Sequence, residues 1–137
     1  MITLNQYVGT YREHPDWTPT RQQNAQTLLA RSWSLEAEMA RLGVKFPDNP
    51  KTKSGISGDT NGGFRPQDCP VGAKNSPHKE GQGVDRYDPD GKIDAWCMAH
   101  QDRLAVHGIW IEHPSATEGW SHWQSRPVPS GNRVFYP

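Results

Sequence analysis

The sequence has no long hydrophobic run, which excludes a membrane-spanning helix. No segment approaches the roughly 20 consecutive apolar residues that crossing a bilayer requires. The N-terminal segment MITLNQYVGTYREHPDW has neither the basic region nor the apolar stretch of a secretory signal peptide. We therefore expect a chain that is made without a signal peptide and does not insert into a membrane.

Concentrated positive charge is also missing. The 15 lysines and arginines balance the 15 aspartates and glutamates, so the formal net charge is zero. Nucleic acid binding depends on clustered lysine and arginine side chains that neutralise many phosphates. The sequence contains no such run, and nucleic acid is therefore not expected as a partner.

Cysteine is scarce, with only Cys69 and Cys97 in the chain. Two cysteines form one bridge at most, which excludes a disulfide framework. We expect two buried or partly buried thiols in a reducing compartment. Cys97 and His100 share one helical face and could both bind zinc. A structural zinc ion needs four protein ligands, however, and Cys69 is the only plausible further ligand. Packing explains these residues better than metal binding.

Several neighbouring aspartates raise the alternative of a calcium site. They lack the glycine and the distal glutamate that an EF-hand loop places at fixed positions. The segment DPDG at 88–91 is instead predicted as a turn. The aspartates concerned are Asp85, Asp88, Asp90 and Asp94.

The composition predicts one loop-rich domain spanning residues 1–137. This length suffices for a single hydrophobic core. Hydrophobic residues make up only 33% of the chain, and 13 glycines and 12 prolines favour short strands joined by loops. Six tryptophans are too many for a disordered chain.

Two helices are predicted. The first covers 18–43, because Thr18 can cap it, Pro19 suits its first turn and Gly43 can end it. Its apolar face follows the helical spacing and is assigned to core packing: Leu28, Ser32, Leu35, Met39 and Leu42, widened by Leu29 and Trp33. The second helix is predicted over 92–107, ending at Gly108.

The remaining elements are strands and loops. The segment 44–77 is rich in glycine, proline, asparagine and aspartate and is predicted as a long loop, with a weakly indicated strand at GGFRP (62–66). Strands are expected at 109–113, 119–125 and 133–136. Strands preceded and interrupted by helices indicate an α+β fold with a small, mostly antiparallel sheet.

The segment NSPHKEGQGVD, residues 75–85, contains two residue types that bind zinc. His78 and Asp85 are too far apart for one helical face but suit a turn that leads into a strand, and the glycines between them permit a tight turn. His122, flanked by two tryptophans, is a third candidate. Partial desolvation by these rings favours the neutral imidazole that binds metal.

Three segments, GGFRP (62–66), NSPHKEGQGVD (75–85) and GWSHWQ (119–124), together resemble the M15 family of zinc metallopeptidases, which includes D-alanyl-D-alanine carboxypeptidases and phage endolysins. In NSPHKEGQGVD, the residues Ser76, His78, Gly81 and Asp85 match the family motif S-x-H-x-x-G-x-A-x-D, and Gly83 stands where alanine is common. The segment GGFRP is similar to S-G-[YF]-R-P, and GWSHWQ at 119–124 resembles the Trp-x-His element. The order of the three segments is also that of the family.

The resemblance implies a Hedgehog/DD-peptidase-like fold and a zinc ion held by His78, Asp85 and His122. It also implies that Arg65 lies beside the site and binds carboxylate or carbonyl groups of the substrate. A guanidinium suits this role because it offers a fixed fork of hydrogen-bond donors.

The function implied is a zinc-dependent peptidase that cleaves peptidoglycan stem peptides, as a phage endolysin, a virion-associated lysin or a DD-carboxypeptidase. Its partner would be the peptidoglycan peptide, and we expect a monomer. The missing signal peptide fits a phage-encoded protein made in the host cytoplasm and acting on the cell wall, or carried in the virion. The alternative is a catalytically inactive phage structural or cell-wall-binding module that retains the fold.

The sequence departs from the family at the catalytic carboxylate. Zinc peptidases need a carboxylate to accept the proton of the attacking water, and many family members place it three residues before the last histidine, where this chain has Gly119. Glu118 lies one residue too early and reaches the metal only if the chain bends at Gly119.

Glu112 is the other candidate for this carboxylate. If 109–113 and 119–125 pair across a loop at 114–118, residue 112 faces 120 and residue 110 faces 122. Glu112 then shares a face with His122, diagonal to it at roughly 7–8 Å. The sequence leaves the choice between Glu112 and Glu118 open.

Overall fold

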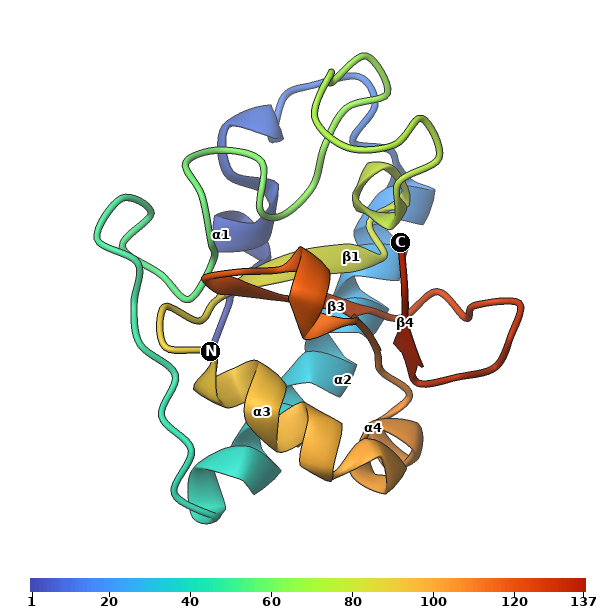
Figure 1. Ribbon diagram of the computed structural model, residues 1–137. Helices are drawn as coiled ribbons and strands as arrows, with labels where there is room; N and C mark the ends of the chain where they lie inside the picture. Colours follow the sequence, from blue (N-terminus) through green and yellow to red (C-terminus); the bar gives the residue numbers. More distant parts are fainter.

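A long helix, α2, lies behind a four-stranded sheet, and two shorter helices, α3 and α4, lie below the sheet in Figure 1. The computed structural model describes residues 1–137. Its architecture is α+β, as the sequence predicts. The helices are α1 (Leu4–Val8), α2 (Pro19–Arg41), α3 (Lys92–Ala99) and α4 (Gln101–His107), and the strands are β1 (Gly83–Tyr87), β2 (Trp110–Glu112), β3 (Trp120–Gln124) and β4 (Val134–Phe135). None of these helices combines the length and apolar character needed to cross a bilayer.

Helix α2 confirms the first predicted helix. The Thr18 hydroxyl accepts a hydrogen bond from the Arg21 amide at 3.3 Å, and Pro19 occupies the first turn. Gly43 follows the helix with φ of +90°, a conformation that glycine adopts without strain. Most of the predicted apolar face is buried, but Trp33 is 39% exposed, and Leu42 is 65% exposed because it lies beyond the last turn.

The predicted helix over 92–107 is wrong as a single element, since it breaks at His100 into α3 and α4. In a continuous helix the His100 amide would donate to the carbonyl of Trp96. Here the imidazole Nδ1 of His100 contacts that carbonyl at 2.7 Å, and the amide turns to Cys97. The His100 ring also stacks on the Trp96 ring with centroids 4.1 Å apart. The side chain thus replaces the backbone donor where the helix ends.

The sheet has the strand order β1-β3-β2-β4, with antiparallel pairs β1·β3 and β2·β3 and a parallel pair β2·β4. This confirms the small, mostly antiparallel sheet and its three predicted strands. The predicted register is wrong by two residues, because Trp110 pairs with Gln124 rather than with His122. A 3-10 turn at Pro114–Ala116 and a further turn to Gly119 lengthen the connection. The shift by an even number leaves every side chain on its predicted face.

The long segment 44–77 contains no regular strand, and the strand weakly indicated at 62–66 is not formed. Its backbone amides form single hydrogen bonds with scattered partners: the Phe64 amide donates to the Tyr7 carbonyl and the Arg65 amide donates to the His78 carbonyl. Residues 55–62 instead cover the free edge of β1, where Ser57 donates to Asp85 at 2.8 Å and Asp85 donates to Gly62 at 2.7 Å. The loop therefore forms a wall beside the middle of β1.

Alternation along β3 separates the core from the opposite face of the sheet. Trp123 is fully buried in the hydrophobic core beside α2 residues such as Leu28 and Leu35. Because neighbouring residues of a strand point to opposite sides, His122 and Gln124 face away from that core. This second face carries the candidate site.

Candidate metal centre

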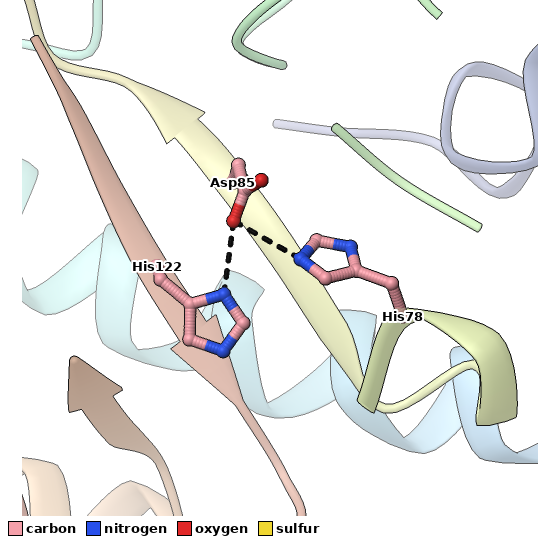
Figure 2. Close-up of side chains that lie close together, drawn as sticks. All are labelled: His78, Asp85 and His122. Carbon is pink, nitrogen blue, oxygen red and sulfur yellow. Dashed lines mark hydrogen bonds and ion pairs between the residues drawn. The ribbon is translucent and has the colours of Figure 1, made fainter. Parts of the chain in front are cut away.

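Three buried side chains meet on the outer face of the sheet (Figure 2). The His78 Nε2 atom lies 3.1 Å from Asp85 Oδ1, and His122 Nδ1 lies 2.9 Å from the same oxygen. Asp85 and His122 are direct partners in the β1·β3 pair. The relative exposures of His78, Asp85 and His122 are 2%, 6% and 5%. The structure therefore brings together all three residues that the sequence predicts as metal ligands.

Local structure places His78 at this point. Ser76 caps the 3-10 turn Pro77–Glu80 by accepting from the His78 amide at 3.3 Å. Gly81 ends the turn with φ of +74°, and a Cβ atom there would lie 2.5 Å from the Arg21 carbonyl oxygen. The chain then enters β1, as expected for a turn leading into a strand. Gly81 is thus required both for its backbone conformation and for its closeness to α2.

Each imidazole has a hydrogen-bond acceptor at the ring nitrogen that faces away from Asp85. This outer acceptor determines which nitrogen carries the proton and leaves the lone pair of the other nitrogen directed at Asp85. His78 Nδ1 lies 2.7 Å from the Gly63 carbonyl oxygen, which only accepts hydrogen bonds, so Nδ1 carries the proton. His122 Nε2 lies 2.8 Å from Gln124 Oε1, and the Gln124 amide is oriented by donating through Nε2 to the Arg126 carbonyl. In the neutral rings, His78 Nε2 and His122 Nδ1 therefore both present lone pairs to a carboxylate oxygen. Three acceptors this close need a proton or a cation among them.

The donor set fits a zinc ion. Zinc binds imidazole nitrogen and carboxylate oxygen, and catalytic sites keep three protein ligands with one open position. Tetrahedral bonds of about 2.0–2.1 Å place ligand atoms about 3.3 Å apart, close to the 2.9 and 3.1 Å separations here. Hydrogen-bonded outer partners of both imidazoles are also characteristic of metal sites. These three residues could therefore hold a metal ion.

Burial and charge act differently on the three groups. Burial lowers the pKa of His78, which favours the neutral imidazole. Burial also acts to lower the pKa of His122, but the hydrogen bond and charge of Asp85 outweigh it and raise that pKa. Burial acts to raise the pKa of Asp85, yet the facing His78 and His122 rings hold it well below its ordinary value. The centre is thus an anionic carboxylate between two imidazoles.

Arg65 lies beside the site, as expected, and contacts the metal-ligand candidate Asp85. Its Nη2 atom donates to Asp85 Oδ2 at 3.0 Å, and its Nε atom donates to the Asn61 carbonyl at 2.6 Å. The residue is only 7% exposed. The guanidinium therefore holds the second carboxylate oxygen and leaves Oδ1 directed at the two histidines. Binding of substrate by Arg65 stays a prediction.

Glu112 lines the cavity that contains the triad, a space of about 360 Å³ that is also bounded by Trp120 and Phe135. Continuing the β2·β3 register by one residue places Glu112 opposite His122, with Cα atoms about 4.5–5.5 Å apart. Glu112 is also paired with Phe135 of β4. Burial raises the pKa of Glu112, with the nearby charge of Asp85 adding to the shift.

Glu118 is placed elsewhere. It is exposed and lines a separate hollow next to Asp90 and Asp94. Gly119 does bend the chain, with φ of +86°, but the bend leaves Glu118 outside the cavity that contains the triad. Of the two carboxylates that the sequence left open, only Glu112 lies with the three candidate ligands.

The competing metal patterns are not assembled. Cys97 is buried in the core, Cys69 lies near Asn61, and both are free thiols, as expected. Asp88 accepts hydrogen bonds from two amides at the start of α3, which explains it as a helix cap. A group that the sequence analysis did not consider, His14, Asp16 and Asp68, also lies within metal-binding range. It is more exposed, and the Asp16 amide donates to His14 Nδ1 in a local turn.

Two partners of the site were missed by the sequence analysis. Gln124 lies two residues after His122, so strand alternation could have placed it on the same face. The Gly63 carbonyl carries no side-chain signal and could not have been identified. Comparison of the chain with models of known protein families, with curated proteins and with solved structures finds no match.

Proposed function

We propose that this protein is a zinc-dependent peptidase acting on peptidoglycan stem peptides, as a phage endolysin, a virion-associated lysin or a carboxypeptidase. The observation that carries the proposal is the convergence of His78 Nε2, His122 Nδ1 and Asp85 Oδ1, with each imidazole proton held by an outer acceptor. The choice of substrate rests on the resemblance of three segments to the M15 metallopeptidases. The Hedgehog/DD-peptidase-like fold belongs to the same proposal.

His78, Asp85 and His122 would hold the zinc ion. When bound, zinc supplies a Lewis acid that polarises the scissile carbonyl and lowers the pKa of water. Glu112 accepts the proton of the attacking water and passes it to the departing amine. Its raised pKa suits both halves of this exchange, because a group that titrates nearer neutrality both takes and returns a proton readily.

Arg65 has a supporting role in this scheme. Its ion pair fixes the orientation of Asp85, and the residue lines the two cavities that adjoin this carboxylate, with Nη1 3.5 Å from the Val71 carbonyl oxygen. A substrate carbonyl next to Asp85 would find a donor there. Of the role predicted from sequence, contact with a substrate carbonyl belongs to this proposal, and it is combined with orientation of a metal ligand.

The test combines metal analysis with digestion of purified peptidoglycan. Stoichiometric zinc in the purified protein and new amine termini in digested peptidoglycan are expected. Zinc without new termini would favour the alternative, an inactive structural or wall-binding module. Absence of stoichiometric zinc after incubation with the metal would overturn the proposal.

A further inference from the structure

The cavity that contains the triad continues on the other side of Asp85. The first cavity extends from Asp85 towards Glu112 and Phe135. A second cavity of about 610 Å³ lies against the loop 57–62. The two share the same dividing residues, Arg65, Gly72, Asp85 and Trp120. The candidate metal centre therefore lines the first cavity, and its ligand Asp85 also borders the second.

The wall of the second cavity is held in place before any ligand binds. Backbone hydrogen bonds join Ser57 and Gly62 to Asp85 at 2.8 and 2.7 Å. The Asn49 side chain donates to the Gly58 carbonyl at 2.9 Å, and Tyr11 donates to the Asn61 side chain at 2.8 Å. A preformed wall lowers the entropy cost of binding a flexible chain. The loop is thus suited to hold an extended ligand segment.

The chemistry of this wall favours neutral or amine-bearing groups. Ser57, Thr60 and Asn61 offer hydroxyl and amide groups. Asp59 adds a carboxylate whose ion pair with Lys51, at 3.7 Å, has both side chains 71% exposed, so that pair is weak and leaves the carboxylate accessible. These groups can form hydrogen bonds with peptide amides and, at Asp59, an ion pair with an amine.

Neither cavity is matched to a terminal carboxylate. Recognition of a carboxylate is strongest when a guanidinium or ammonium donates two hydrogen bonds to it. Arg65 is the one lysine or arginine that lines the two cavities. Its Nη2 and Nε atoms already donate to Asp85 and to the Asn61 carbonyl. Its third nitrogen, Nη1, lies 3.5 Å from the Val71 carbonyl oxygen. The guanidinium therefore has no pair of free nitrogens to offer a carboxylate, although Nη1 can still donate one hydrogen bond to a carbonyl.

We infer that this site cleaves a peptide bond in the interior of a chain, and that the second cavity holds the residues on one side of that bond. The inference rests on the proposed function and narrows it to an endopeptidase. In the reaction, the hydroxyl of water adds to the carbonyl carbon, the C–N bond breaks, and the proton of water goes to the departing nitrogen. The products are one new carboxylate and one new amine.

The test compares two stem peptides that differ only at the C-terminus, one with a free carboxylate and one with an amide. We expect zinc-loaded protein to cleave both at an internal bond, with kcat/KM values within about threefold. A site that requires the carboxylate would lose about 100-fold or more on amidation, and this result would overturn the inference while leaving the peptidase function intact. No cleavage of either peptide or of peptidoglycan would overturn the proposed function, and the inference with it.

A substitution at the mouth of the second cavity gives an independent test. Val71 lines this cavity and is 44% exposed, whereas Val106 is 64% exposed on α4 and lines neither cavity. V71W is expected to lower kcat/KM for a long stem peptide by at least about tenfold, through lost binding of the remote segment, with unchanged zinc binding. V106W is the matched control and should behave as wild type. Equal activity of V71W and V106W on the long peptide would overturn the assignment of the second cavity.

Discussion

Asp85 and His122 are separated by 37 positions in the sequence, yet they are direct partners across β1 and β3, with His122 Nδ1 2.9 Å from Asp85 Oδ1. Side chains of directly paired residues lie on the same face of an antiparallel sheet. The pair therefore needs only His78, delivered by the preceding turn, to complete three ligands. The candidate centre is thus a product of strand pairing. It depends on its three ligands, on the hydrogen-bond acceptors behind the two imidazoles and on the packing that holds the sheet in place.

Removal of a ligand should abolish tight zinc binding. H78A and H122A each delete one of three ligands, so the zinc affinity should fall by more than the about 10–100-fold typical of losing an outer partner. Competition with a chelator of known affinity measures the change. H113A is the control, because His113 forms a local turn with Ser115 and is not part of the triad. Wild-type affinity in H78A would exclude His78 as a ligand.

Gln124 should control which nitrogen of His122 carries the proton. In Q124L the acceptor for Nε2–H is lost, so the proton is free to move to Nδ1, and the zinc affinity should fall about 10–100-fold. Nitrogen NMR of the metal-free protein should show His122 Nε2 protonated in wild type and a smaller fraction of protonated Nε2 in Q124L. Q101L, at an exposed position on α4, is the matched control. An unchanged tautomer in Q124L would refute this role.

Glu112, rather than Glu118, should be needed for hydrolysis. E112Q keeps the shape of the side chain but removes the proton acceptor, so kcat should fall about 10²–10⁴-fold while zinc binding persists. E118Q, at an exposed position outside the cavity, should retain full turnover. Digestion of purified peptidoglycan by zinc-loaded variants measures both. The reverse pattern would transfer the role to Glu118.

The contact between α2 and α4 should weaken in acid. Hydrogen bonds from Arg103, followed by the contact with His107, lower the pKa of Glu38 to about 2 from an ordinary value of 4.5. A carboxyl with a lowered folded-state pKa stabilises the fold fully above its unfolded pKa, and this stabilisation is lost as the pH falls from about 4.5 towards about 2. Melting temperatures of wild type and E38Q should differ at pH 6 and converge near pH 2. E13Q, an exposed substitution, should follow wild type throughout.

The buried Arg86 should depend on its partner Glu36. The guanidinium packs against both the Phe46 and the Trp123 ring, about 5 Å from each centroid, and Nη1 is 2.9 Å from Glu36 Oε2. E36Q leaves this charge unpaired in the core and should lower the free energy of unfolding by about 3–5 kcal/mol. Denaturant titration measures the loss, with E13Q again as the control. A loss below about 1 kcal/mol would show that the aromatic rings alone suffice to hold the charge.

Sequence patterns predicted the parts of this fold that are set by local chemistry. Thr18 and Pro19 mark the start of α2 because capping and proline preferences act within one turn. The His78 turn and the strand containing Asp85 are likewise local. The break at His100 was missed because it depends on a single contact between the imidazole and the Trp96 carbonyl, and no glycine or proline marks the position.

The candidate site required information that sequence spacing does not contain. The even periodicity of strands placed Glu112 on the face of His122, but the register was two residues off because the connection contains an extra turn. The outer acceptors are set by tertiary packing: the Gly63 carbonyl is delivered by a loop whose amides pair with scattered partners. Such contacts depend on the assembled fold and leave no pattern in the chain.

The row formed by Asp85, His122, Glu112 and Phe135 takes one residue from each of the four strands. A slip of one residue in β3 would turn His122 into the hydrophobic layer and bring Trp123 to the outer face. A bound metal ion would favour the native alignment over this slip, because the slip removes His122 from the face that carries Asp85. Metal binding would then stabilise the native register of β1 and β3 relative to the shifted register, and it would favour the correctly paired sheet during folding.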